Sequence, residues 1–312
     1  MGSLTLLNLV KQATGEMGVQ QPSTVISNTT LYVIQLLNLA NGLGQNLARE
    51  YNWQGFDKEY RFTTVFYTYT GTLTPNSTTV SNLSSTTGLT STPTYFTVTG
   101  SGINQDTTLV SVNSGASTCV LSQLPNVTSV TNTVTLNFCQ TQYAMPSDYD
   151  RLIDRTDWSK TQHWEMLGPE TAQQWQWLKS GFISTGPRLR YRILGSTFQI
   201  FPPQTTALYL GFEYMSNQWV GTAANTALTL ASYTADTDVS VFPDSLMITG
   251  LKWRWATEKA NNAENEYKAA YMRQLDIAIS ADGGSKTLQM APSVSQLLLS
   301  QTNIPDSGFG TP

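Results

Sequence analysis

The sequence is poor in charged residues, histidine and cysteine. Only 12% of its 312 residues are charged, the net charge is −4, and the single histidine is His163. One imidazole excludes a metal site that needs two histidines from the same chain. The mild net charge argues against broad electrostatic attraction to nucleic acid. Two cysteines, Cys119 and Cys139, are too few for a disulfide framework, and we expect buried free thiols more than a bridge between them.

Long apolar runs are also absent. None approaches the roughly 18–20 residues needed to cross a membrane, and residues 1–20 lack the basic, apolar and cleavage regions of a signal peptide. Aromatic residues, by contrast, make up 11% of the chain, which is too many for a disordered protein. These features predict a soluble protein made in a cytoplasm, with two domains or with one domain that carries a large insertion.

The longest stretch with a sustained helical period and no proline runs from residue 244 to 281. Small and apolar side chains recur there at three- and four-residue steps, Tyr271 and Leu275 among them. An unbroken helix over this stretch would be roughly 57 Å long. We therefore predict that it is the spine of the fold, and that Gly250 or Asn261 is where it could kink.

Two further helices are predicted before the spine. The first begins with Ser3 as its N-cap and ends near Gly18, and the second covers about 28–51. In the second helix, Leu31 and Ile34 trace one apolar face, which further leucines widen. Because two apolar-faced helices are unstable alone in water, we expect them to pack on the spine.

The sequence then changes from helical to strand-like patterns. Residues 56–69 are aromatic, β-branched and roughly alternating, which predicts a strand. Residues 71–140 contain 29 serines and threonines and one charged residue, Asp106. Short alternating runs separated by turn residues continue throughout them, as in an all-β, sandwich-like domain. We therefore predict that 71–140 is an insertion into a host domain.

After the insertion, we expect a short helix opened by residues 168–172, a hairpin over 187–201 with its turn at Gly195–Ser196, and a strand over 207–220. The predicted fold class is α+β: a helical bundle with a long C-terminal spine helix and antiparallel strands, an inserted all-β domain and an extended C-terminal tail. The predicted divisions are a first core part at 1–70, the insertion at 71–140, a second core part at 141–286, and the tail at 287–312.

Groups that could support catalysis are few. The densest acidic group contains Asp148, Asp150, Asp154, Asp157 and Glu165. Paired carboxylates can hydrolyse glycosides or bind a hard cation. Because Arg151, Arg155 and Lys160 lie among them, we favour local ion pairs and helix capping. We predict no catalytic residue, no metal and no cofactor.

Tryptophan offers a second candidate surface. Four tryptophans, at 175, 177, 253 and 255, could stack on sugars or bases. Packing in the core or between subunits is the favoured interpretation, since aromatic side chains bury large areas.

Four parts of the sequence, in this order, resemble the head-to-tail adaptor family of short-tailed bacteriophages, also called tail tubular protein A-like or connector proteins. They are the leucine-rich helix pair near the N-terminus, MPSDYDRLIDRTDW, LRYRILGSTFQIFPP with ALYLGFEYMSNQWV, and FPDSLMITGLKWRWATEKANNAENEYKAAYMRQL. The resemblance covers about 1–70 and 141–286 and lies in the ordered set, because no single motif is diagnostic. Residues 71–140 depart from the minimal family pattern.

This resemblance implies a virion protein of the tail or neck, made in the bacterial cytoplasm. Usually twelve copies form a ring below the portal protein, double-stranded DNA passes through without sequence-specific binding, and the far face accepts a tail tube or nozzle protein. We expect the tail to dock on the portal through Leu297, Leu298, Leu299, Ile304 and Phe309. We expect contacts between subunits at Trp253, Trp255, Tyr267, Tyr271 and Leu275.

Two other functions remain open from the sequence. One is a tail-associated glycan or cell-wall hydrolase that uses Asp148, Asp150 or Glu165. The other is a carbohydrate-binding or adhesive module centred on 71–140, the stretch that could also hold tail fibres.

Overall fold

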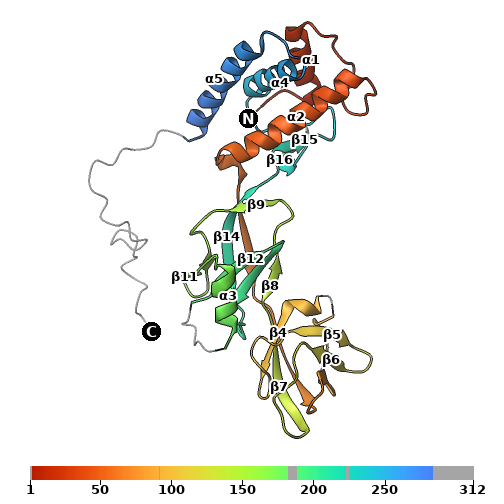
Figure 1. Cartoon of the computed structure of the whole chain (residues 1–312), viewed down its shortest axis with the longest axis vertical. Helices are drawn as coiled ribbons and strands as arrows, with labels where there is room; N and C mark the ends of the chain where they lie inside the picture. Colours follow the sequence, from red (N-terminus) through yellow and green to blue (C-terminus); the bar gives the residue numbers. More distant parts are fainter. Residues whose placement is uncertain (1, 91, 182–187, 223–224, 284–312) are drawn as a thin grey trace, which may run out of the picture.

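Strands outnumber helices in this computed structural model, which describes residues 2–90, 92–181, 188–222 and 225–283. Within those residues the chain forms 17 strands and five α-helices. The molecule is elongated, with helices at one end, sheets in the middle and a group of short strands at the other end (Figure 1). The predicted α+β fold class, a helical bundle around a long spine helix, is therefore wrong. The chain is β-rich, with several small antiparallel sheets.

The helical end combines four helices with a small sheet. A single hydrophobic core runs through the helices and reaches the sheet. Its largest fully buried side chain is Trp219, whose indole N–H donates to the carbonyl of Ala231 at 2.8 Å. The elements are α1 (Leu6–Met17), α2 (Leu31–Glu50), α4 (Asp244–Glu258), α5 (Glu264–Asp282), β15 (Val220–Thr222), β16 (Asn225–Leu230) and β17 (Val239–Ser240).

The predicted spine is two helices, α4 and α5, that pack against each other. In the turn between them, Ala260 has a φ of 48° and the side chain of Asn261 accepts a hydrogen bond from the N–H of Ala263 at 3.1 Å. Trp253 and Tyr271 stack across the helix pair with ring centroids 5.0 Å apart. The chain turns here because folding back buries apolar side chains that one straight helix would leave in water.

The N-terminus is tied to the start of α4, which corrects the predicted cap of the first helix. Ser3 donates to the carboxylate of Asp244 from its N–H at 3.0 Å and from its hydroxyl at 2.8 Å. The N-cap of α1 is instead Thr5, whose hydroxyl accepts from the N–H of Asn8 at 3.4 Å. The helix ends at Gly18 in the left-handed conformation, as predicted.

The middle of the molecule holds two sheets and α3 (Ala172–Lys179). The predicted hairpin with its turn at Gly195–Ser196 is confirmed. The predicted strand 207–220 is shorter and ends in a bulge at Met215–Ser216. One sheet contains β1 (Asp57–Thr63), β14 (Tyr209–Ser216), β10 (Trp158–Ser159) and β11 (Trp164–Glu165), with β9 (Tyr149–Leu152) also on β14; the other contains β12 (Arg190–Leu194), β13 (Thr197–Phe201) and β8 (Gln142–Ala144).

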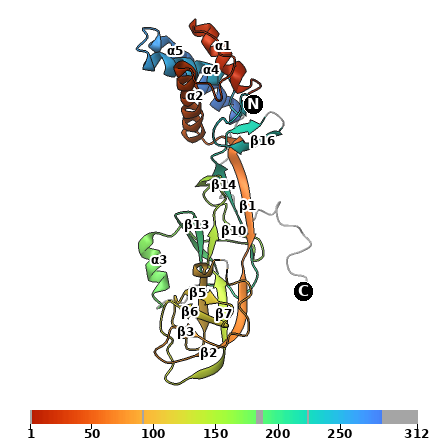
Figure 2. The ribbon, with the colours of Figure 1, turned by 90° about the vertical axis from the view of Figure 1, so that its right-hand side faces the viewer.

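Residues 66–140, which we call the β module, form the opposite end from the helices (Figure 2). The predicted strand 56–69 is two strands, because Thr64 and Val65 separate β1 from β2, which belongs to another sheet. The module has a hydrophobic core of its own, with Leu136 and Phe138 fully buried. Its sheets are β2 (Phe66–Leu73), β7 (Thr131–Gln140) and β4 (Phe96–Gly100), and β3 (Thr79–Val80), β6 (Thr118–Leu121) and β5 (Leu109–Asn113). The predicted division of the chain into four parts stays a prediction.

Both cysteines lie in the core of the β module or at its edge, and both are free thiols. Burial raises the pKa of Cys119 to about 12 and that of Cys139 to about 11. Thiolate, the reactive form, is therefore scarce at neutral pH, so neither cysteine is suited to nucleophilic chemistry.

Gly44 is where α2 packs most closely on the indole of Trp219, and a Cβ there would overlap the ring. We expect Gly44→Ala to lower the free energy of unfolding by about 1–3 kcal/mol, because the added methyl forces helix and ring apart. This loss outweighs the roughly 1 kcal/mol by which alanine favours a helix. Urea unfolding measures the change.

Gly42→Ala, in the same helix, is the matched control. A Cβ at this position would meet only the flexible guanidinium of Arg254, at 3.1 Å. This variant should be unchanged or up to about 1 kcal/mol more stable. Equal losses in the two variants would contradict the proposed contact with Trp219.

Candidate functional site

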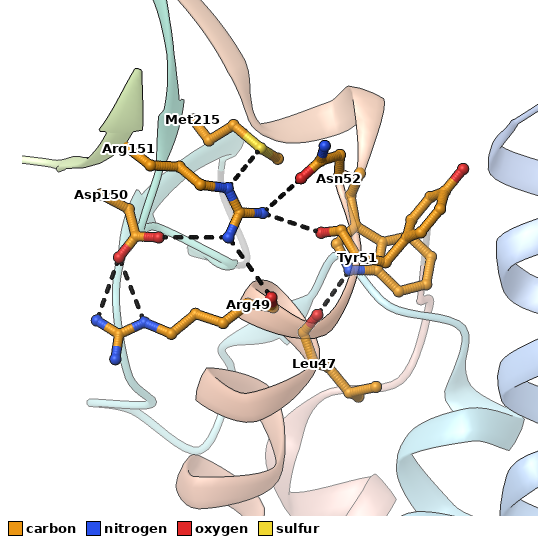
Figure 3. A network of polar contacts seen from close by, with 8 residues as sticks. Leu47, Arg49, Tyr51, Asn52, Asp150, Arg151 and Met215 are labelled. Carbon is orange, nitrogen blue, oxygen red and sulfur yellow. Dashed lines mark hydrogen bonds and ion pairs between the residues drawn. The ribbon is translucent and has the colours of Figure 1, made fainter. Parts of the chain in front are cut away.

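A polar network joins the helical end to the middle sheets (Figure 3). The guanidinium of Arg151, on β9, donates to the carbonyl of Tyr51 at 3.3 Å and to the side-chain oxygen of Asn52 at 2.8 Å. It also reaches the carbonyl of Arg49 at 3.5 Å and the sulfur of Met215 at 3.2 Å. The last carbonyl groups of a helix have no partner within it, and the helix dipole favours a cation there. Arg151 thus caps α2 from a distant part of the chain.

Asp150 completes this network. Its carboxylate lies 3.1 Å from the guanidinium of Arg49 and 3.9 Å from that of Arg151. The side chain of Arg49 is 72% exposed, so its ion pair contributes little to stability. The hydrogen bonds of Arg151 to α2 are therefore the stronger part of the junction.

A second network surrounds Asp148, between β1 and β14. Its carboxylate accepts hydrogen bonds from the ammonium of Lys58 at 2.6 Å, the hydroxyl of Ser216 at 2.8 Å and that of Tyr214 at 2.9 Å. Burial alone would raise the pKa of Asp148, but these three donors outweigh it and hold the pKa below its ordinary value. The carboxylate is therefore ionised and satisfied, which suits a structural role.

Asp157 is the most buried carboxylate of the predicted acidic group, at 2% exposure. One of its oxygens accepts from the hydroxyl of Tyr191 at 2.6 Å, and the other has no partner among the residues that the structure describes. Burial raises the pKa of Asp157 to about 6, and the nearby charges of Asp154 and Glu165 add to this, while the hydrogen bond from Tyr191 opposes it. The group is poised to lose its proton near neutral pH.

The acidic residues thus belong to separate networks. Asp148 and Asp150 each pair with a cation, and Asp157 faces Tyr191. Glu165 lies on the short strand β11, whose register places it opposite Trp158. No group of three or more histidines, cysteines or acidic residues able to hold a metal occurs in the described part of the chain.

The five residues predicted to form the subunit interface lie in different surroundings. Tyr271 and Leu275 are buried in the core of their own chain, at 4% and 5% exposure, so a neighbouring copy cannot reach them in this conformation. Trp253 and Tyr267 are partly exposed and lie beside the ammonium groups of Lys268 and Lys252. The fifth, Trp255, is also partly exposed, below the ammonium of Lys259. The interface stays a prediction.

Sequence reasoning missed an apolar surface on the helices. The face of α2 that packs inward contains Val33, Leu36 and Leu43, whereas Leu31 and Ile34 are 70% and 39% exposed. Met272 and Ile277 on α5 are exposed as well, at 40% and 55%. Apolar residues surround much of α2, so the pattern alone could not show which of them face water.

The residues predicted to dock on the portal, Leu297, Leu298, Leu299, Ile304 and Phe309, lie outside the described residues. In the described part of the chain, no helix has the length and apolar character needed to cross a bilayer.

A family model described as SU10 adaptor protein matches residues 112–294, which is more than half of the chain. The match extends from β5, in the β module, through the middle sheets and both helices of the C-terminal pair. These matched residues define the class of the protein as a phage adaptor. The chain belongs to the SU10 adaptor protein family, and it is thus a structural adaptor of the virion that associates with other virion proteins. A search of curated proteins gives no match.

The buried carboxyl of Asp157 predicts a specific pH dependence. An aspartate whose pKa in the folded state, about 6, exceeds its unfolded value of about 3.9 favours the folded state when protonated. This contribution is complete below pH 4 and is lost as the pH rises through 6. Relative to Asp157→Asn, we therefore expect the wild type to lose about 2–3 kcal/mol of unfolding free energy between pH 4 and pH 7.

Urea unfolding at a series of pH values measures this difference. Tyr191→Phe removes the hydrogen bond that helps the ionised form, so its loss between pH 4 and pH 7 should be steeper than that of the wild type. If the wild type and Asp157→Asn give parallel curves, Asp157 does not titrate in this range.

Proposed function

We propose that this adaptor is a head-to-tail connector. Identical copies form a ring, dodecameric as in the family that the sequence resembles, which joins the portal protein to a tail tube or nozzle and gives double-stranded DNA a passage. Membership of a phage adaptor family supports a place in the virion. The observation that carries the ring is the exposed apolar surface of the helical end.

A closed ring requires two different surfaces that meet between neighbouring copies. The helical end offers two candidates: Leu31 and Ile34 on α2, and Met272 and Ile277 on α5. Trp255 extends the first of them, since it lines a small pocket together with Gln35, Asn38 and Leu39 of α2. Leu31 and Ile34 lie three residues apart on one face of α2, next to Trp255, and this grouping supports a contact surface there.

The proposed role is structural, not catalytic. Two of the three carboxylates that the hydrolase alternative would use, Asp148 and Asp150, are held in ion pairs with Lys58 and Arg49. These contacts support a role in holding the parts of the subunit together, and a ring under mechanical force requires parts that keep their relative positions.

The low charge of the chain supports the proposed passage for DNA. Attraction to phosphate depends on lysine and arginine, and the chain has 17 of these against 21 acidic residues. A weakly acidic ring lets DNA move through without holding it and without recognising its sequence.

The remaining partners are assigned by position in the chain. We propose that residues 287–312 dock on the portal through Leu297, Leu298, Leu299, Ile304 and Phe309. The opposite face of the ring receives the tail tube or nozzle protein, and the β module is available to tail fibres.

The ring is tested by placing charge on its first contact surface. We expect the double variant Leu31→Glu with Ile34→Glu to fold normally, because both side chains face water in the subunit, but to remain monomeric, because burying two carboxylates at an interface is unfavourable. Light scattering coupled to size exclusion measures the mass. Val110→Glu, at an apolar position of the β module that is 46% exposed, is the control and should still assemble. Rings of normal mass from the double variant would refute this surface.

The tail is tested by ending the chain after Gly283. This protein should fold and form rings, since its described core is complete, but should fail to join portal-containing heads. A full-length variant with serine at the five docking positions separates the side chains from chain length and should fail in the same way. Incorporation into heads at the normal level, measured by cosedimentation, would exclude the docking role.

A further inference from the structure

An open cleft of about 500 Å³ lies between the β module and the middle sheets. Residues of β4 and the loop that follows it line one side, and β13 and α3 line the other. The ammonium of Lys179 and the carboxylate of Asp106 meet in its lining at 2.8 Å. Asp106 is the single charged residue of the 71–140 stretch, so this ion pair leaves the cleft without net charge.

The most unusual group in the cleft is the side chain of Gln199. On β13, Phe198 and Ile200 belong to the core of the middle sheets, and Gln199 lines the cleft together with parts of Ile200 and Phe201. Gln199 is only 8% exposed. Among the residues that the structure describes, none hydrogen-bonds its carboxamide.

Neither amide atom of Gln199 is among the fully buried polar atoms without a partner, so the carboxamide opens onto the cleft and can hydrogen-bond only to what enters it. Leucine is similar in size to glutamine and carries no polar group that needs a partner. A glutamine here therefore indicates that the partner arrives from outside the subunit. Two more glutamines of the lining, Gln105 and Gln142, also have side chains that no described residue hydrogen-bonds.

A carboxamide offers both a donor and an acceptor, which matches the N–H and C=O of a peptide group. Sugars need similar hydrogen bonds but usually also an exposed aromatic face to stack on. The two aromatic rings of this cleft belong to Trp175 and Phe201, which are 2% and 7% exposed. They pack edge to face with their ring centroids 6.2 Å apart, so neither offers an open face for a sugar. A peptide backbone therefore fits this lining better than a sugar.

We propose that the cleft binds an extended, uncharged polypeptide segment of another virion protein, with the carboxamides of Gln199 and Gln142 paired to its peptide groups. The absence of net charge in the lining selects a segment without charged side chains. That the partner is another virion protein follows from membership of a phage adaptor family. The proposal does not require that the subunits form a ring.

The probe is a set of fluorescent 15-residue peptides that span the other virion proteins of the same phage, together with a peptide of residues 287–305 of this chain. Fluorescence polarisation is measured with the full-length protein and repeated with the monomeric variant that carries Leu31→Glu and Ile34→Glu. We expect uncharged peptides of a partner protein to bind both. We expect Gln199→Leu to weaken this binding at least tenfold without lowering the Tm, because its carboxamide has no hydrogen-bond partner among the described residues of the subunit.

Gln176→Leu is the matched control, because Gln176 is an exposed residue of α3 that does not line the cleft. It should change neither the binding nor the Tm. The proposal is overturned if no peptide of another virion protein binds, if Gln199→Leu binds as well as the wild type, or if only the 287–305 peptide binds. Displacement of bound peptide by neutral oligosaccharides would assign the cleft to a sugar. Since the monomeric variant is included, a failure of peptide binding is distinguishable from a failure of ring assembly.

Discussion

The contact of Arg151 with the end of α2 is the constraint on which the shape of the subunit depends. A helix that ends at a joint leaves carbonyl groups without partners, and here a guanidinium from the middle sheet occupies that position. The planar fork of arginine presents five donors in fixed directions, whereas the ammonium of lysine is a compact charge with three donors. The helical end is therefore aligned with the long β1–β14 pair by hydrogen bonds as well as by packing.

The same logic extends to the other joints of an elongated molecule. A chain with only 12% charged residues has few ion pairs available, and several of them connect segments far apart in sequence. Lys58 and Asp148 fix β1 to the loop before β9, Arg49 and Asp150 link α2 to β9, and Lys179 and Asp106 link α3 to the β module. The Arg49–Asp150 pair is the most exposed of the three and contributes little to stability. What all three pairs contribute is orientation, because each holds together two parts of the chain that are distant in sequence.

Local patterns predicted individual elements better than they predicted the architecture. The hairpin at Gly195–Ser196 and the end of α1 at Gly18 follow from turn chemistry that a few neighbouring residues determine. The prediction of one long spine helix was wrong because the break depends on tertiary packing. The stretch has a helical period on both sides of Asn261, and only the packing of Tyr271 against Trp253 shows that the chain folds back. The acidic group between 148 and 165 was predicted to form local ion pairs, but apart from the 3.9 Å contact of Asp150 with Arg151 its partners are Lys58, Arg49 and Tyr191, which are distant in sequence and could not be named from it.

The face of α2 shows why the surfaces of an adaptor are hard to infer from its sequence. A soluble monomer would separate apolar from polar positions, so its hydrophobic period would point to the core. In α2 both the buried residues and the exposed Leu31 and Ile34 are apolar. The hydrophobic pattern therefore combines the positions that face the core with positions that face outward. The core of a single subunit does not account for apolar residues at the outward-facing positions of Leu31 and Ile34. The excess of apolar residues over what the core of α2 uses is the feature on which the proposed assembly rests, and it becomes visible only once the core has been assigned.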